Sequence, residues 1–428
     1  MYLYCGQSRL HGPVDIPGSK SHTIRAVTFC SLADGESTIR EPLSSADTQA
    51  AVDTWRALGA EIEVEPGLWR VRGTGGEPAT PGDFIDVKNS GTTLRLAVGA
   101  AALLREGYAG FTGDHQIRRR PIGPLACSLN DLGAKVFLMR NNGCPPLVVG
   151  GRLRGGRTSI EAVTSQYLSS LLICTPLADG DSVIDVPLLN EQPYVHITLD
   201  WLARMGAVLE RDELRQFRVP GRQRYRATDV RVAADFSSAT FFLAAGALGD
   251  NDVLVRGLDM NDPQGDKAVV EYLQRMGASV EFLPEGIRVR PGTLTGCEID
   301  MNATPDALPM MAVVGCFARG TTRLVNVPQA RLKETDRIAV MAAELGKMGA
   351  RIKELPDGLI IEQSDLRPAA VSGHDDHRVV MALAVAGCCI PSGTRIDTAE
   401  AMSVTFPTFV ECLTGLGGDV RLEGTARS

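Results

Sequence analysis

The chain of 428 residues is longer than one hydrophobic core usually supports, so two domains are expected. Its 44% hydrophobic and 22% charged residues are typical of a globular protein, and a net charge of -7 gives no reason to expect nucleic acid or an anionic membrane as a partner. No apolar run approaches the length of a membrane span, about 20 residues, and the first residues lack the layout of a signal peptide. We therefore expect a cytoplasmic protein whose ten scattered cysteines are reduced.

One pattern recurs six times along the chain: an amphipathic helical run, a glycine, and an alternating segment typical of a strand. Large apolar residues three positions apart precede each glycine, as in Trp55 and Leu58, and lie on the helix face that packs on a sheet. The glycine is expected to end this helix in the left-handed conformation. At a spacing of 68 to 74 residues, these glycines are Gly59, Gly133, Gly206, Gly277, Gly349 and Gly417.

A second helix is expected in every copy, and it begins with a small or polar residue. Apolar runs follow, as in Leu94 to Leu104, which predicts helices buried inside the units. Their N-termini carry unsatisfied N–H groups and partial positive charge, so several of them aimed at a shared centre would form a site for anions. The predicted starts are Ser21, Gly91, Ser165, Ser237, Asp306 and His377.

Basic, hydroxyl and acidic residues cluster at related points of the copies. Such cations and hydroxyls bind phosphate and carboxylate groups. Asp306 and Glu334 stand among them, and we expect both to transfer protons, since carboxylates would otherwise oppose the binding of an anion. The patterns of a P-loop, a nucleophile elbow, a zincin and a nicotinamide site do not occur.

Taken in order, seven of these segments resemble the enolpyruvyl transferases over residues 17–406, and most closely the members that act on shikimate 3-phosphate. The segments are PGSKSxxxR, NSGTTLR, RRPIG, TSQY, PYVHIT, RLKETDR and DDHR. The resemblance implies an α/β protein with a two-domain inside-out α/β barrel, which has six βαβαββ repeats, three in each domain. One domain would cover residues 17–228, on the shikimate 3-phosphate side. The other would join residues 1–16 to residues 229–428 and carry the catalytic acid and base, with the active site in the cleft between the domains.

The reaction that the resemblance implies adds the 5-hydroxyl of shikimate 3-phosphate to C2 of phosphoenolpyruvate and then eliminates phosphate, without a metal or an organic cofactor. Asp306 would act as the base on the hydroxyl, Glu334 would protonate and later deprotonate C3, and Lys20 would assist the departure of phosphate. The residues that would hold shikimate 3-phosphate are Lys20, Ser21, Arg25, Thr164, Ser165, Gln166, Tyr194, Asp306, Gln329 and Lys333. Those that would hold phosphoenolpyruvate are Lys20, Gly91, Arg120, Gln166, Arg337 and Arg378.

Three positions depart from the usual pattern of this family. Val404 stands where many members have a lysine, and Gln329 replaces an asparagine. Glu191 stands near the position where members of the family have a serine that helps to hold the substrate phosphate. The loss of one charge-assisted contact costs about 1.5 to 3 kcal/mol, so activity is expected to survive.

Three alternative functions stay open: enolpyruvyl transfer to UDP-N-acetylglucosamine, transfer to another hydroxy acid, and binding of phosphorylated ligands without catalysis. The first usually requires a cysteine in a mobile loop, and residues 114–123 contain none. The last is disfavoured because Asp306, Glu334 and Lys20 are all present. We expect a monomer.

Overall fold

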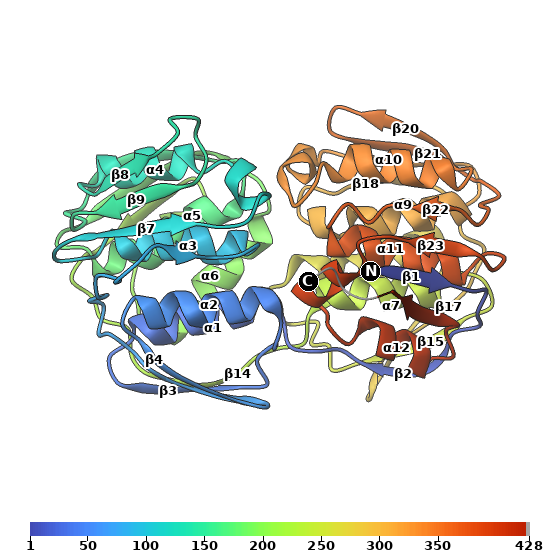
Figure 1. The fold of residues 1–428 in the computed structure, drawn as a ribbon, viewed down its shortest axis with the longest axis horizontal. Coiled ribbons are helices and arrows are strands. Elements are labelled where there is room, and N and C mark those ends of the chain that lie inside the picture. Colours follow the sequence, from blue (N-terminus) through green and yellow to red (C-terminus); the bar gives the residue numbers. More distant parts are fainter. Residues whose placement is uncertain (425–428) are drawn as a thin grey trace. The chain divides into compact units, whose positions relative to one another are not determined.

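The computed structural model describes residues 1–424, which form two compact units. The first unit comprises Gly18–Val232, and the second comprises Met1–Pro17 together with the chain from Ala233 onward. Six four-stranded sheets, three in each unit, follow the six predicted copies (Figure 1).

The third copy shows the repeating topology most completely. Its elements are β10 (Gly156–Ala162), α5 (Ser165–Cys174), β11 (Ser182–Leu189), α6 (Gln192–Arg204), β12 (Glu210–Asp212) and β13 (Gln216–Val219). The sheet order is β10-β11-β13-β12, in which β10 and β11 are parallel and the other pairs are antiparallel. This is the predicted βαβαββ unit.

The other two copies of the first unit repeat this arrangement. The first consists of α1 (Lys20–Leu32), β3 (Glu36–Arg40), α2 (Ala46–Ala57), β4 (Glu61–Glu65), β5 (Leu68–Arg72) and β14 (Asp229–Arg231). The second consists of β6 (Ile85–Asp86), α3 (Gly91–Ala101), β7 (Tyr108–Thr112), the 3-10 turn η1 (Ile117–Arg119), α4 (Gly123–Asp131), β8 (Lys135–Leu138) and β9 (Leu147–Gly150). In Figure 1, α1 and α2 lie along the sheet that contains β3, β4 and β14.

The second unit contains the fourth, fifth and sixth copies. The fourth consists of β2 (His11–Asp15), α7 (Phe236–Gly246), β15 (Asp252–Arg256), η3 (Gly265–Lys267), α8 (Ala268–Met276), β16 (Ser279–Leu283) and β17 (Gly286–Arg290). The fifth consists of β18 (Glu298–Asp300), η4 (Pro305–Ala307), α9 (Leu308–Phe317), β19 (Thr321–Val325), η5 (Pro328–Leu332), α10 (Arg337–Lys347), β20 (Arg351–Leu355) and β21 (Gly358–Glu362). The sixth consists of β22 (Ala370–Val371), α11 (His377–Cys388), β23 (Thr394–Ile396), η6 (Ala399–Val404), α12 (Phe409–Gly415), β24 (Val420–Glu423) and β1 (Tyr2–Cys5).

Three copies are completed by strands that are distant in the sequence, and in the fourth copy this strand is β2, which pairs in parallel with β15. β1 pairs with both β23 and β24, so the N-terminal strand closes the last sheet. β14 pairs in parallel with β3 of the first copy. Residues 229–232 therefore belong to the first unit, and the border predicted between Thr228 and Asp229 falls between Val232 and Ala233. At the other crossing, Pro17 belongs to the second unit, whereas the sequence prediction assigned it to the first.

Each unit has a hydrophobic core of its own, centred on buried helices. In the first unit α3 contacts α1 and α5, and in the second unit α7, α9 and α11 contact one another. The sheets pack outside these helices, which is the predicted inside-out arrangement. All six cap glycines adopt positive φ angles between 80° and 103°, so the predicted helix ends are confirmed.

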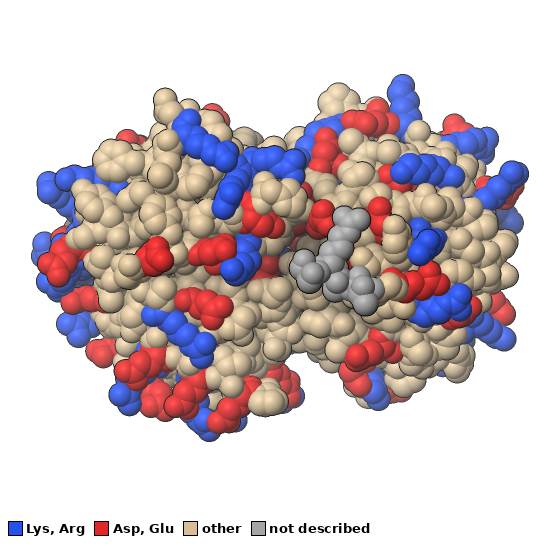
Figure 2. All heavy atoms as spheres, in the orientation of Figure 1, with Lys and Arg blue, Asp and Glu red and all other residues tan. Residues whose placement is uncertain are grey.

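The surface and the cysteines fit a globular protein. Acidic and basic side chains are interspersed over the face drawn in Figure 2. All ten cysteines are free thiols, as predicted. Within residues 1–424, no helix combines the length and the apolar character that crossing a membrane requires.

Candidate active site

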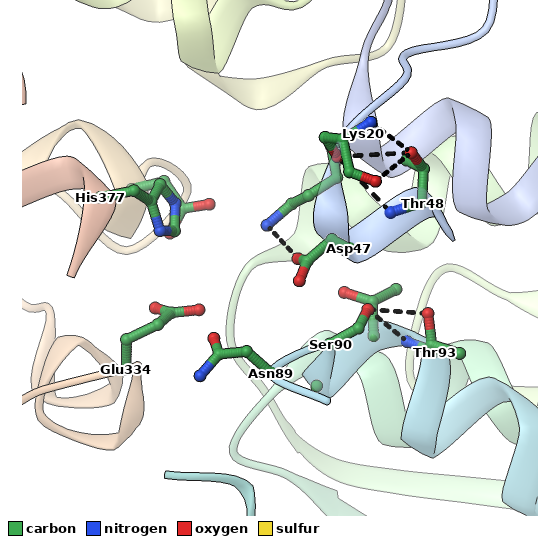
Figure 3. A network of polar contacts seen from close by, with 12 residues as sticks. Lys20, Asp47, Thr48, Asn89, Ser90, Thr93, Glu334 and His377 are labelled. Carbon is green, nitrogen blue, oxygen red and sulfur yellow. Dashed lines mark hydrogen bonds and ion pairs between the residues drawn. The ribbon is translucent and has the colours of Figure 1, made fainter. Parts of the chain in front are cut away.

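Lys20 is the first residue of α1, and its ammonium group is held by an acid from the next helix. Ser19 caps α1 by accepting a hydrogen bond from the backbone N–H of His22. Lys20 Nζ lies 3.2 Å from Oδ2 of Asp47 in α2, and the two side chains are 15% and 6% exposed (Figure 3). Asp47 therefore fixes the position of the ammonium group. The sequence prediction did not include Asp47, although the capping box formed by Ser45 and Thr48 places it in the first turn of α2.

Two guanidinium groups lie close to Gly91 at the start of α3. Arg95 Nη1 and Nη2 each donate a 3.0 Å hydrogen bond, to the carbonyls of Gly91 and Pro121. A β-carbon at Gly91 would lie 2.5 Å from Arg120 Nη1 and 2.6 Å from Arg95 Nη1. Only glycine leaves room for both cations at this helix N-terminus. Gly91 and Arg120 were both predicted, whereas Arg95, which is 3% exposed, was not.

The start of α5 lies beside the start of α3 in the same unit. Gln166 Nε2 donates a 3.1 Å hydrogen bond to Thr92 Oγ1, and its Oε1 is buried without a hydrogen-bond partner in the described residues. At the same helix end, the hydroxyls of Thr164 and Ser165 both donate to Oε2 of Glu191, at 3.1 and 2.9 Å. The backbone N–H of Ser165 donates to the same oxygen at 3.2 Å.

Arg25 is a buried residue of α1 that connects this helix with α6. Its guanidinium donates to Thr198 Oγ1 at 2.9 Å and to the carbonyls of Ser21 and Tyr194, both at 3.1 Å. The side chain is 1% exposed, and burial lowers the pKa of the guanidinium to about 10. Arg25 thus fixes the backbone of two other predicted residues, Ser21 and Tyr194. The first unit brings all of its predicted residues to the starts of α1, α3, α5 and α6.

In the second unit, Arg337 is the centre of a network of three carboxylates. It donates to Asp376 Oδ2 and Asp306 Oδ1 at 2.8 Å, and to Glu334 Oε2 at 2.7 Å. Its side chain is only 1% exposed. Burial disfavours the charge of Arg337, but Asp376, Glu334 and Asp306 outweigh this effect and raise the pKa of the guanidinium. Asp306 and Glu334, the two predicted proton carriers, are thus bound to one guanidinium.

Asp306 lies in the 3-10 turn η4, which leads into the buried helix α9. Besides Arg337, two further cations approach its carboxylate: Arg378 Nη2 lies 3.2 Å from Oδ2, and Lys333 Nζ lies 3.7 Å from Oδ1. All of these cations were predicted from the sequence.

Gln329 is 2% exposed and donates from Nε2 to the carbonyl of Asn302 at 2.9 Å.

The sequence prediction did not assign a role to Asp376, which is fully buried. Its Oδ1 accepts a 2.9 Å hydrogen bond from the backbone N–H of Arg378, so it caps α11. Thr335 Oγ1 also donates to Asp376, at 3.1 Å. Burial tends to raise the pKa of Asp376, but the charge of Arg337 overcomes it, and the pKa is lowered. An acidic residue directly before a predicted buried helix was the sequence feature that could have indicated this role.

Asp266 in η3 is a buried acid of the same unit, and it gives a prediction for stability. Burial, and after it the charge of Asp306, raise its pKa to about 7. The native state therefore binds more protons than the unfolded chain, whose Asp titrates at about 3.9, and stability falls as the pH rises from about 4 to about 7. The variant Asp266→Asn has no titrating group at this position and does not lose stability in this way. We expect the melting temperature of the variant minus that of wild type to increase from about pH 4 to about pH 7 and to stay constant above this range.

Thermal unfolding at a series of pH values measures this difference. Asp250→Asn is the matched control because the Asp250 side chain is 84% exposed, and its difference from wild type should not vary with pH. A difference for Asp266→Asn that falls with rising pH would contradict the expectation.

Comparison with known proteins agrees with the fold. The family model described as EPSP synthase (3-phosphoshikimate 1-carboxyvinyltransferase) matches residues 5–413. The chain belongs to the EPSP synthase family. The matched range includes most of both units. Among residues 1–424, no group of three or more His, Cys, Asp or Glu is arranged to hold a metal ion.

Individual relatives of the family cover nearly the whole chain. A 3-phosphoshikimate 1-carboxyvinyltransferase from Acetivibrio thermocellus is 54% identical over 98% of this chain and 99% of its own length. The protein of that name from Ruminiclostridium cellulolyticum is 51% identical over 99% of this chain and 100% of its own length. The solved structure of EPSP synthase from Acinetobacter baumannii has a TM-score of 0.82 and 26% identity, and covers 98% of this chain and 100% of that one.

Proposed function

We propose that the protein transfers the enolpyruvyl group of phosphoenolpyruvate to the 5-hydroxyl of shikimate 3-phosphate, releasing phosphate, in chorismate and aromatic amino-acid biosynthesis. The observation that carries this proposal is the placement of Asp306 and Glu334 on the single guanidinium of Arg337, at 2.8 and 2.7 Å. Two acids held side by side among cations can move two different protons next to bound anions. Membership of the EPSP synthase family and the names of the relatives support the same reaction.

Shikimate 3-phosphate is assigned to the hydroxyl-rich part of the first unit. Thr164 and Ser165 at the N-terminus of α5 would bind its phosphate, with Lys333 as the cation. Ser21, Gln166 and Tyr194 would hold the rest of the molecule, with Lys20, Gln329 and Asp306 beside it. Arg25 supports this group through the carbonyls of Ser21 and Tyr194.

Phosphoenolpyruvate is assigned to the cations. Arg120, next to Gly91 at the start of α3, would bind it together with Lys20 and Gln166. Arg337 and Arg378 of the second unit would complete its binding. Because the assigned groups come from both units, we propose that the units close on the two substrates during turnover and exclude water. We further propose that the enzyme works as a monomer in the cytoplasm.

The reaction then needs three proton transfers, one to Asp306 and two that involve Glu334. In the first step the oxygen of the 5-hydroxyl bonds to C2 of phosphoenolpyruvate, and Asp306 accepts the proton of this hydroxyl. Glu334 donates a proton to C3 in the same step. In the second step Glu334 removes a proton from C3 while the bond from C2 to the phosphate oxygen breaks. Lys20 stabilises the departing phosphate, and the surrounding cations stabilise the charge of the tetrahedral intermediate.

A coupled assay of phosphate release tests the proposed reaction. Incubation with shikimate 3-phosphate and phosphoenolpyruvate should release phosphate, and omission of either substrate should abolish the release. UDP-N-acetylglucosamine and other hydroxy acids, offered in place of shikimate 3-phosphate, test the alternative acceptors. A folded preparation that releases no phosphate from the first pair of substrates would refute the proposal.

Gly91→Ala should weaken the binding of phosphoenolpyruvate without unfolding the protein. Its β-carbon would lie 2.5 Å from Arg120 Nη1, while Arg95 is held by two carbonyls, so the Arg120 guanidinium has to move. We expect the KM for phosphoenolpyruvate to rise about tenfold, the effect of one weakened charged contact. Steady-state kinetics measures this change, and calorimetry should find shikimate 3-phosphate binding unchanged.

The matched control is Gly346→Ala in α10, where an added β-carbon would have no neighbour within 4 Å. Its kinetic constants should equal those of wild type. An unchanged KM for phosphoenolpyruvate in Gly91→Ala would mean that Arg120 does not bind this substrate.

A further inference from the structure

The carboxylate of Glu191 occupies the N-terminus of α5. Its Oε2 accepts hydrogen bonds from the Thr164 hydroxyl at 3.1 Å, the Ser165 hydroxyl at 2.9 Å and the Ser165 backbone N–H at 3.2 Å. The side chain comes from the turn between β11 and α6 and is 1% exposed. A buried anion of the chain itself therefore binds to these three donors.

The same three donors would suit a phosphate oxygen. A helix of ten residues offers partial positive charge and free N–H groups at its first turn, and hydroxyls beside it add donors for an anion. Carboxylate and phosphate oxygens make the same kind of charge-assisted hydrogen bond with such donors. The two anions repel each other, so Thr164 and Ser165 can serve only one of them at a time.

The backbone at Glu191 is strained in a way that delivers the carboxylate to this place. Its φ angle is 58°, in the left-handed region that non-glycine residues rarely adopt. Such a conformation persists only when the surrounding contacts maintain it. The contacts with Thr164 and Ser165 are contacts of this kind, and they give the buried hydroxyl of Ser165 an acceptor.

We propose that Glu191 is an internal competitor for the phosphate group of the substrate: its carboxylate must leave Thr164 and Ser165 before that phosphate binds there. This proposal rests on the proposed function, because it takes shikimate 3-phosphate as the substrate. Shikimate 3-phosphate also contacts other groups, and these contacts allow it to displace the carboxylate. A small free anion such as inorganic phosphate lacks them, so Glu191 excludes it from the site.

The first test compares two ligands that differ only in the phosphate group. Calorimetry on the full-length protein gives the dissociation constants of shikimate 3-phosphate and of shikimate for wild type and for Glu191→Ser. We expect shikimate 3-phosphate to bind about tenfold more tightly to the variant, the effect of one charged contact, and shikimate to bind equally to both. Glu161→Gln in β10 is the control for the lost charge, because Glu161 is exposed in the same unit, and it should bind as wild type does.

The second test does not depend on the substrate. Inorganic phosphate should raise the melting temperature of Glu191→Ser by more than it raises those of wild type and Glu161→Gln, in which only the cations assigned to phosphoenolpyruvate can bind it. If shikimate 3-phosphate binds to none of the proteins, the proposed function fails, while this test still decides whether Glu191 occupies an anion site.

Two results would overturn the proposal. One is a Glu191→Ser protein with the wild-type melting temperature that binds shikimate 3-phosphate no more tightly than wild type does. The other is an increase in melting temperature on addition of inorganic phosphate that is no larger for this variant than for wild type. If Glu191→Ser does not fold, Glu191→Gln replaces it in both tests, because its amide keeps the size of the side chain and an oxygen acceptor while the charge is removed.

Discussion

Glu334→Gln should bind shikimate 3-phosphate as wild type does and turn over about 10³-fold more slowly, within the range that loss of a general acid or base causes. The amide has the size of the carboxylate and can still accept the hydrogen bond that Arg337 Nη2 donates to Glu334 at 2.7 Å. It cannot donate a proton to C3 and take one back. Isothermal calorimetry measures the binding, and the phosphate-release assay measures the turnover.

Glu354→Gln is the matched control for this variant. Glu354 in β20 is paired with Arg331 Nη2 at 2.7 Å, in the same unit, but its side chain is 44% exposed. Loss of this charge should leave turnover unchanged, since exposed ion pairs contribute little. Wild-type turnover in Glu334→Gln would remove Glu334 from the mechanism.

Much of the fold was predictable because its determinants are local and repeated. Each helix that ends at a cap glycine, such as Gly59 or Gly277, combines an apolar face with a left-handed residue, and both features can be read within ten positions. The pairing of strands that are distant in the sequence was harder to predict. β14 is three residues long and pairs with β3, almost 200 positions earlier, so no local pattern indicates that Asp229–Arg231 belongs to the first unit.

In the candidate site, too, local sequence patterns were predictable and contacts between distant residues were not. Lys20, Gly91 and Arg337 lie in segments with an unusual local composition. Gly91 begins α3, as predicted, and Lys20 begins α1 one residue before the predicted start at Ser21, whereas the start of α10 at Arg337 was not predicted. Their partners are distant in sequence. Asp376 meets Arg337 across 39 positions, so the pairing depends on how α10 and α11 pack rather than on any sequence pattern. The effect of Glu191 on Thr164 and Ser165 is equally a consequence of tertiary structure, since 26 positions separate Glu191 from Ser165.

Arg337→Lys should lose activity and stability together, although it keeps the positive charge. The guanidinium donates four hydrogen bonds to Asp306, Glu334 and Asp376 in a fork that a lysine ammonium cannot reproduce. Asp376 has no exposure to solvent, and breaking a buried ion pair costs about 3 to 5 kcal/mol when one partner is lost entirely. A lysine that still reaches one carboxylate should lower the free energy of unfolding by only part of this amount. We expect kcat/KM to decrease by about a hundredfold or more, because Asp306 and Glu334 are no longer held by the same group.

Denaturant unfolding and steady-state kinetics test this expectation, with Arg331→Lys as the control. Arg331 also pairs with two acids, Asp336 at 2.6 Å and Glu354 at 2.7 Å, but its side chain is 24% exposed and no proton transfer is assigned to either partner. The same exchange of arginine for lysine should therefore cost little activity there. If Arg337→Lys retained wild-type kcat/KM, the fork of Arg337 would not be what holds the two acids in position, and the mechanism would lose its structural basis.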